Sequence, residues 1–391
     1  MKTPRFFVKR IFPAYMYARV SCPRLRFGRR TCTHWITGTP RFFVKRKMRI
    51  RLSASAARAA RARAPRAPLR CASTVSMPPG LISQTPLLES APLSAAVGTR
   101  VLLKVDALQP SGSFKDRGMA FMCSTLRERG VTSVICSSGG NAGHAVAAMG
   151  RRLGMSVKVI VPTTTKRIML DKIRAQGAEV TVHGANWNEA DGLARELVAA
   201  DPAAEYIPPY DHELLWEGHS SLVDELVAAG IRPGAVVASV GGGGLINGLY
   251  VGMRRHGWHN VRVVSAETDG ANCFAAAIAA GKPVRLSAIT SVATSLGALQ
   301  CSATSLRLAA EQPTTACTVS DAEAVSACAL LLNEHRLLVE PACGAAIALL
   351  TAERYRPIFV QHDEVVVVVC GGSGVNWEIM EQWRRDGLWA A

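Results

Sequence analysis

The stretch Pro110-Ser-Gly-Ser-Phe-Lys-Asp-Arg-Gly118 holds one lysine, Lys115, in a turn rich in serine and glycine just before an expected helix. A lysine forms a Schiff base with a carbonyl cofactor only where a shaped, partly desolvated pocket holds its amine. A single lysine more often carries only solvated charge. The rest of such a pocket must therefore be recognisable elsewhere in the chain.

Three further turns could supply it. They are Ser-Ser-Gly-Gly-Asn-Ala-Gly at 137–143, Gly-Gly-Gly-Gly-Leu at 241–245 and Cys-Gly-Gly-Ser-Gly at 370–374. In the second turn, glycines let several backbone N–H groups point inward at a helix N-terminus, which suits phosphate. The alternatives are a plain strand-to-helix turn or a dinucleotide loop, but no Gly-x-Gly-x-x-Gly with a downstream acid accompanies it.

The other two turns carry polar side chains. Ser138 to Gly143 offers amides and hydroxyls that could bind a substrate carboxylate, and Asn141 could donate to a phenolate-like oxygen. The alternative is a simple helix N-cap. Cys370 ends an apolar run, and its thiol is a weak hydrogen-bond partner that would not hold a full positive charge on a pyridine nitrogen. The alternative for Cys370 is a buried structural cysteine.

From about residue 80, apolar runs alternate with amphipathic stretches, the pattern of a parallel sheet with helices on both faces. Ligands of such α/β sheets bind at the carboxyl ends of the strands, where these turns lie. The expected strands are 100–105, 133–136, 156–161, 178–182, 235–240, 261–266 and 364–370, and expected helices include 142–153, 188–199, 222–229 and 321–334.

The formal charge of +17 over 391 residues is unevenly distributed. Residues 1–80 hold 20 Lys+Arg and no acid, whereas residues 81–391 hold 26 Lys+Arg against 29 Asp+Glu, a charge of −3. The body is therefore not expected to bind nucleic acid. No apolar run is long enough to span a bilayer. The 11 cysteines have neither a metal-ligand nor a disulfide pattern, which favours a reducing compartment.

The leader, residues 1–80, contains the octapeptide Thr-Pro-Arg-Phe-Phe-Val-Lys-Arg twice, at 3–10 and 39–46, and is expected to be disordered. Its Arg, Ala and Ser content suits an organellar transit peptide. Alternatively, translation starts at Met77 or the leader is a gene-model artefact. We expect a mitochondrial or plastid location in the first case and a cytoplasmic one if Met77 is the start. A further alternative is that the basic leader binds nucleic acid, and such binding would weaken as the salt concentration rises.

Together the motifs resemble the fold-type II pyridoxal-phosphate enzymes, most closely the liver-type L-serine dehydratase/L-threonine deaminase family. The resemblance runs from about Gln84 to Trp383. It also covers Tyr206-Ile-Pro-Pro-Tyr, Trp216-Glu-Gly-His, Ile289-Thr-Ser-Val-Ala and Val339-Glu-Pro-Ala-Cys-Gly-Ala-Ala. It implies a fold similar to the tryptophan synthase β-subunit, with two open twisted α/β domains and the cofactor in the cleft between them. The implied large domain is 81–106 with 212–391, and the implied small domain is 107–211.

The resemblance also implies the role of each site residue. Lys115 would bind pyridoxal phosphate covalently and act as the catalytic base, and Phe114 would pack on one face of its ring. Ser138, Gly140 and Asn141 would bind the substrate carboxylate and the ring hydroxyl, with Ser138 also counted as catalytic. The phosphate would lie on Gly241, Gly242, Gly243, Gly244 and Leu245, Cys370 would face the ring nitrogen, and Glu267 would lie near the cofactor. Backbone carbonyls of Gly241, Ala271, Leu296 and Ala298 would hold a monovalent cation such as K⁺.

The implied activity is dehydration and deamination of L-serine to pyruvate and ammonia, with L-threonine giving 2-oxobutyrate, in a homodimer of gluconeogenic amino-acid metabolism. Two positions depart from the family. Ser295 replaces an alanine on the ring face opposite Phe114, and Gly139 replaces an alanine of the substrate loop. Serine racemase, another fold-type II enzyme and a non-catalytic pyridoxal-phosphate-binding protein therefore remain alternatives.

Overall fold

The computed structural model describes residues 74–389, all within the compact unit Pro65–Ala391. The expectations for residues 1–73 lie outside the described residues. Val75 and Met77, which belong to the expected leader, contact the body: Val75 N donates to Asp224 Oδ2 at 3.1 Å, and Met77 packs against a hydrophobic core.

The larger of two sheets has six strands in the order β1-β2-β10-β7-β8-β9. Only β1 runs antiparallel to its neighbour. The strands are β1 (Leu87–Glu89), β2 (Arg100–Lys104), β10 (Glu364–Val368), β7 (Ala235–Ser239), β8 (Arg262–Thr268) and β9 (Thr314–Val319). Every residue of β10 and β7 is buried, as expected for parallel strands covered on both faces.

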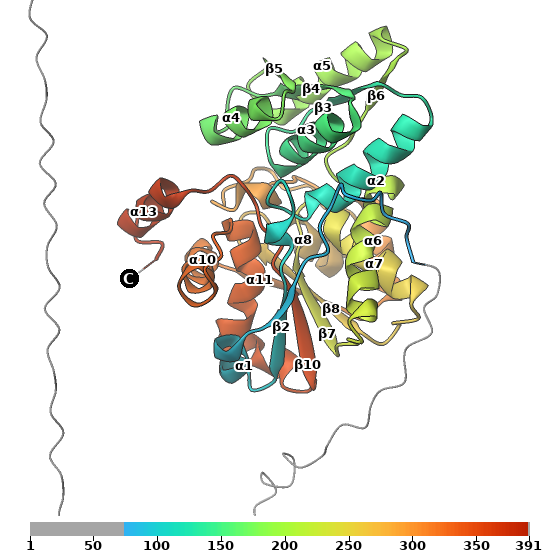
Figure 1. The fold of residues 1–391 in the computed structure, drawn as a ribbon. Coiled ribbons are helices and arrows are strands. Elements are labelled where there is room, and N and C mark those ends of the chain that lie inside the picture. The colour runs from blue at the N-terminus through green and yellow to red at the C-terminus, as the bar shows by residue number, and fades with distance from the viewer. Residues whose placement is uncertain (1–73, 390–391) are drawn as a thin grey trace, which may run out of the picture. The chain divides into compact units, whose positions relative to one another are not determined.

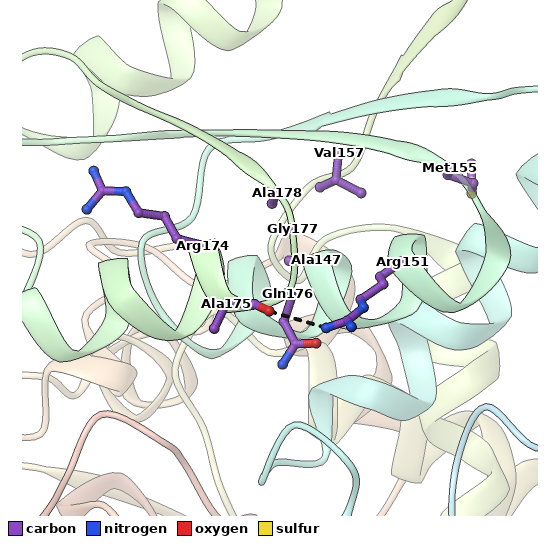
Figure 2. Close-up of a pocket in the computed structure, with 9 residues that line it drawn as sticks. All are labelled: Ala147, Arg151, Met155, Val157, Arg174, Ala175, Gln176, Gly177 and Ala178. Carbon is purple, nitrogen blue, oxygen red and sulfur yellow. Dashed lines mark hydrogen bonds between the residues drawn. The ribbon is translucent and has the colours of Figure 1, made fainter.

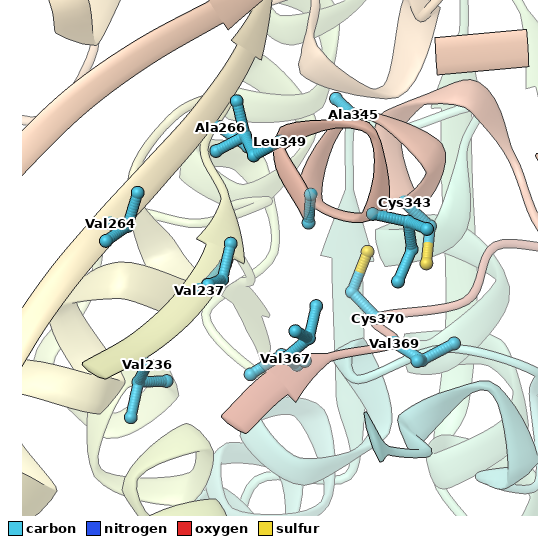
Figure 3. Close-up of a cluster of buried hydrophobic side chains, with 14 of the residues drawn as sticks. Val236, Val237, Val264, Ala266, Cys343, Ala345, Leu349, Val367, Val369 and Cys370 are labelled. Atoms are coloured by element: carbon cyan, nitrogen blue, oxygen red, sulfur yellow. The ribbon is translucent and has the colours of Figure 1, made fainter. Parts of the chain in front are cut away.

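Helices cover both faces of this sheet. Figure 1 shows α10 and α11 on one side and α6 and α7 on the other. Figure 3 shows Ala345 and Leu349 of α11 in the same buried cluster as Val237 of β7 and Val367 of β10. The helices are α1 (Ala91–Val97), α6 (Glu213–Ala228), α7 (Gly244–Arg255), α8 (Cys273–Ala280), α9 (Ala303–Glu311), α10 (Asp321–His335), α11 (Pro341–Thr351), α12 (Arg356–Phe359) and α13 (Trp377–Arg385), with short 3-10 turns at Asp106–Leu108, Thr294–Leu296 and Glu353–Tyr355.

The smaller sheet has four parallel strands in the order β5-β4-β3-β6. The strands are β5 (Glu179–Val182), β4 (Ser156–Val161), β3 (Ser133–Cys136) and β6 (Ala204–Tyr206), and the helices around them are α2 (Lys115–Glu128), α3 (Asn141–Leu153), α4 (Arg167–Ala175) and α5 (Trp187–Ala200). A separate hydrophobic core lies beneath α2 and α3. The α2 helix also packs on α6, and so it contacts elements of both sheets.

Most of the expected boundaries that were wrong differ from the structure by one or two residues. The largest error concerns α6, which begins at Glu213 rather than at residue 222. His212 caps this helix, because its Nδ1 accepts the backbone N–H of Leu214 at 3.1 Å. The segment read only as a family motif, 216–219, is thus the second turn of the helix. No helix of the described residues is long and apolar enough to cross a bilayer.

Candidate active site

The loop before α2 is hydrogen-bonded to the loop after β10. Phe114 N donates to Cys370 O at 3.0 Å, and Gly372 N donates to Gly112 O at 2.9 Å. Ser113 and Gly371 form an isolated antiparallel bridge. These contacts hold Lys115, the first residue of α2, close to Cys370, although more than 250 residues of sequence separate the two.

The Lys115 amine is partly buried. Its Nζ donates to Pro209 O at 2.7 Å and lies 5.0 Å from the centroid of the Phe114 ring. Burial lowers the pKa of Lys115 to about 8, and the nearby thiols of Cys136 and Cys370 oppose that shift. A lower pKa increases the fraction of neutral amine near pH 7, and only the neutral amine is a nucleophile or a base.

The loop of residues 137–140, expected to bind the substrate carboxylate, joins β3 to α3. Gly140 N donates to Ser138 Oγ at 3.3 Å, and Asn141 is the first residue of the helix. A Cβ at Gly143 would lie 1.8 Å from Ser138 O, so only glycine allows the helix to approach the loop this closely. A Cβ at Gly139 would lie 2.5 Å from Thr165 Oγ1.

The glycine loop lies between β7 and α7, as expected. Gly243 has a φ of 102°, which favours glycine. A Cβ at Gly242 would lie 2.4 Å from the ring of Tyr210, and a Cβ at Gly243 would lie 2.0 Å from Ser305 Oγ. No side chain of residues 74–389 caps α7, and its first N–H groups are therefore open to an anion.

Cys370 is 5% exposed and follows the central strand β10. Its Sγ lies 3.3 Å from Ser239 Oγ at the end of β7. Figure 3 shows the sulfur atoms of Cys370 and Cys343 near one another beside α11. The polar group at this end of β10 is therefore a thiol rather than a carboxylate.

Glu267 lies at the end of β8 and is fully buried. Its carboxylate accepts the backbone N–H groups of Phe274 at 2.9 Å and Ala275 at 2.6 Å. Burial raises the pKa of Glu267 to about 8, and the two hydrogen bonds oppose that shift. Glu267, on the strand beside β7, thus accepts hydrogen bonds from the first turn of α8.

The four carbonyls expected around a cation come from loops at this same end of the large sheet. A Cβ at Gly241 would lie 3.2 Å from Leu296 O, and Ala298 N donates to Leu296 O at 2.7 Å. Ala271 N donates to Thr268 O at 2.9 Å just beyond β8. The described residues contain no cluster of three or more His, Cys, Asp or Glu that could hold a metal ion.

Three polar groups of the site were not predicted. Glu340 carries the carboxylate that Asn141 and Ser295 contact, and Ser373 contacts Asn141. Tyr210 packs beneath the glycine loop. Glu340 and Tyr210 stand in stretches that carry the family resemblance, so those stretches held the signal, but neither residue was given a role.

A hollow of about 450 Å³ lies elsewhere. Figure 2 shows the residues that line it, beside α3 and α4. Arg151 Nη1 donates to Ala175 O at its edge, at 3.2 Å. None of the predicted site residues lines it.

These residues fit pyridoxal phosphate. A lysine of lowered pKa, an uncapped glycine-rich helix N-terminus and a thiol gather at the carboxyl ends of the two sheets. They match an aldehyde, a phosphate and a pyridine nitrogen in turn.

A sequence profile of the family described as "Pyridoxal-phosphate dependent enzyme" matches residues 79–371. The chain belongs to the pyridoxal-phosphate dependent enzymes. It is 45% identical over 300 residues to the Homo sapiens protein named serine dehydratase-like, covering 75% of this chain and 91% of that protein. It is 44% identical over 303 residues to the L-serine dehydratase/L-threonine deaminase of Mus musculus, covering 75% and 92%.

A solved structure agrees. The fungal L-serine ammonia-lyase of Rhizomucor miehei superposes with a TM-score of 0.74 at 35% identity, covering 78% of this chain and 98% of that chain. The expected family and the fold-type II architecture are therefore confirmed.

Proposed function

We propose that this protein is an L-serine ammonia-lyase that converts L-serine to pyruvate and ammonia and acts on L-threonine as well, giving 2-oxobutyrate and ammonia. The observation that carries the proposal is the Lys115 amine held close to the Cys370 thiol by the paired loops. The names of the relatives at 44–45% identity support it.

Pyridoxal phosphate, when bound, supplies an aldehyde for the substrate amino group and a ring that withdraws electrons from Cα. Lys115 first holds the cofactor and then, once the substrate has displaced it, takes the Cα proton on Nζ. Its lowered pKa makes Nζ a base near neutral pH. Loss of the β-hydroxyl as water follows, and hydrolysis then releases ammonia and the keto acid.

The remaining residues bind and orient. Ser138, Gly140 and Asn141 take the substrate carboxylate and the ring hydroxyl, and Phe114 packs on the ring. The N–H groups of the glycine loop and Leu245 would hold the phosphate, and the family resemblance suggests that phosphate as the acid for the leaving hydroxyl. Because a neutral thiol at Cys370 leaves the ring nitrogen without a full positive charge, the ring is a weaker electron sink, which favours elimination over transamination.

The proposal also includes a cation site and an oligomeric state. We infer that K⁺ binds the carbonyls of Gly241, Ala271, Leu296 and Ala298, with Glu267 beside them near the cofactor. We also infer a homodimer whose protomers each consist of a large domain, 81–106 with 212–391, and a small domain, 107–211. The two sheets and their separate hydrophobic cores support this division.

The test is keto acid release by residues 77–391 with pyridoxal phosphate and KCl, from L-serine and L-threonine separately, beside the Lys115→Ala variant. We expect pyruvate and 2-oxobutyrate from the parent protein and at least about a 10³-fold lower rate from the variant. Equal turnover by both proteins would rule out the proposed role of Lys115. Size-exclusion chromatography with light scattering tests the dimer.

Serine racemase is the second candidate because Ser295 carries a hydroxyl on the expected second face of the ring. Ser295 Oγ donates to the buried Glu340 carboxylate, and a proton could pass between them. D-serine formed from L-serine, and lost in Ser295→Ala while pyruvate release persists, would support a racemase activity.

A further inference from the structure

Glu340 is a buried carboxylate to which three segments of the chain donate. It immediately precedes α11 and is 6% exposed. Its Oε1 accepts the Gly374 N–H at 2.6 Å, and Ser295 Oγ donates to its Oε2. Asn141 Nδ2 lies 3.2 Å from Oε1 and 3.1 Å from Oε2. All the contacts are donors, which matches an ionised carboxylate.

The loop after β10 fits closely around this carboxylate. A Cβ at Gly372 would lie 2.3 Å from Glu340 Cδ, and a Cβ at Gly374 would lie 2.9 Å from its Oε1. Gly372 also has a φ of 124°, which few other residues adopt. Glu340 is thus fixed by backbone and packing as well as by its hydrogen bonds.

Asn141 is held at both ends of its side chain. Its Oδ1 accepts the Ser373 N–H at 2.9 Å, while its Nδ2 donates to Glu340. Rotating the amide by 180° would place NH₂ against an N–H donor and oxygen against a carboxylate, so only one orientation satisfies both contacts. The two similar distances to Glu340 fit one N–H shared between its oxygens, which leaves the second N–H for a ligand.

A lysine of the small-sheet region completes the cluster. Lys172 Nζ of α4 donates to Ser373 O at 2.6 Å and lies near Glu340. Ser373 Oγ donates to Ser111 O at 2.8 Å, in the loop that carries Lys115. The partners of Asn141 are therefore tied to the Lys115 loop and to α4.

We propose that Glu340 is a positioning residue that fixes the Asn141 amide so that its free N–H meets the ring hydroxyl of bound pyridoxal phosphate. The inference rests on the proposed function only in taking Asn141 as the partner of that hydroxyl. Glu340 acts through Asn141 and touches neither cofactor nor substrate. An N–H donated to the ring oxygen stabilises its anionic form, and losing it changes the cofactor's absorbance bands.

The experiment is a double-mutant cycle of Glu340→Gln and Asn141→Ala on purified holoenzyme. The readouts are the dissociation constant of pyridoxal phosphate and the ratio of its absorbance bands, neither of which requires turnover. We expect each single variant to weaken cofactor binding about tenfold and to shift the bands alike, because each removes one charge-assisted or oriented hydrogen bond. The double variant should show no further change.

Glu364→Gln is the matched control. Glu364 is 4% exposed and begins β10, at the opposite end of that strand from the site. It pairs with Arg100, so the substitution also removes a buried charge. We expect it to lower the urea midpoint of unfolding while leaving cofactor affinity and absorbance within about twofold of the parent.

Additive effects in the cycle, or unchanged absorbance in Glu340→Gln, would overturn the inference. If Glu340→Gln does not fold, the cycle is run with Glu340→Asp, which keeps the charge but withdraws it by one methylene. The same non-additivity is then expected at smaller amplitude. A parent protein that binds the cofactor without releasing keto acid would contradict the proposed function and leave this test intact.

Discussion

Arg117 donates to both oxygens of Asp106, through Nε to Oδ2 at 2.7 Å and through Nη2 to Oδ1 at 2.8 Å. Both side chains are fully buried, and Arg117 Nη1 also donates to Glu225 Oε1 at 2.6 Å. Arg117 lies two residues after Lys115 in α2. This ion-pair network therefore anchors the beginning of the lysine-bearing helix to the turn after β2 and to α6.

Substitution of Arg117 should destabilise the folded protein. We expect Arg117→Met to lower the free energy of unfolding by about 3–5 kcal/mol, because the buried Asp106 carboxylate loses its cationic partner and Glu225 is left with Lys104 alone. Urea unfolding of the cofactor-free protein measures it. Arg167→Met, which breaks an exposed pair with Asp171, is the control and should change stability by less than about 0.5 kcal/mol. Equal effects would contradict a structural role for the buried network.

The lowered pKa of Lys115 predicts a pH dependence of apoprotein stability. The folded pKa is about 8 and the reference value is 10.5. Below pH 8 both states bind the proton, and the cost of burying the charge is present in full. Between about pH 8 and 10.5 the folded state releases the proton first, so stability should rise.

The Lys115→Met substitution removes the free-energy cost of burying the protonated amine in the folded protein. After allowance for partial exposure, we expect the variant apoprotein to be about 2 kcal/mol more stable than the parent at pH 7, with the difference shrinking towards pH 10. Urea unfolding at pH 7, 8, 9 and 10 measures both proteins. A difference that stays constant with pH would indicate that packing, rather than protonation, causes it.

The glycine loop should not tolerate a methyl group at Gly242. The added Cβ would lie 2.4 Å from the Tyr210 ring, and the loop or the ring must move. We expect Gly242→Ala to weaken pyridoxal phosphate binding about 100-fold, measured by fluorescence titration, since several phosphate contacts move together. Gly192→Ala, in α5 with open space around it, should leave binding unchanged and stabilise the helix by up to about 1 kcal/mol.

The proposed cation site predicts a dependence on the monovalent ion. We expect keto acid release to fall severalfold when KCl is replaced by LiCl or by choline chloride at equal ionic strength, because only an ion of suitable size fits four fixed carbonyls. Gly241→Ala, whose Cβ would lie 3.0 Å from Leu296 Cα, should reduce the response to K⁺. Identical rates in all three salts would rule out a functional site.

Local patterns sufficed for the elements that carry the site. The five valines before Cys370 predicted a buried strand, and the four glycines after β7 favoured an open anion loop over a plain turn or a dinucleotide loop. The short strands β1 and β6 and the edge strand β9 were not predicted. The strands β1 and β6 have three residues each, too few to show the alternation of apolar and polar side chains that marks a strand. The strand β9 is half-buried, and its threonines make the same alternation weak.

The role of Glu340 could not be predicted for another reason. Its partners Asn141 and Gly374 lie 199 and 34 residues away, and sequence spacing does not report such distances. A glutamate before a proline reads as the start of a helix, and nothing local marks it as an acceptor for the substrate loop.

The position of β10 determines the order in which the chain can fold. Its five residues pair with both β2 and β7, so the strand made last occupies the middle of the sheet. A nascent chain that ends before residue 364 would hold β1-β2 and β7-β8-β9 as two fragments with unpaired edges, which invite aggregation. We expect the large sheet to close only after the strand has left the ribosome, so that a nonsense mutation between the codons of β9 and β10 would yield insoluble rather than merely inactive protein.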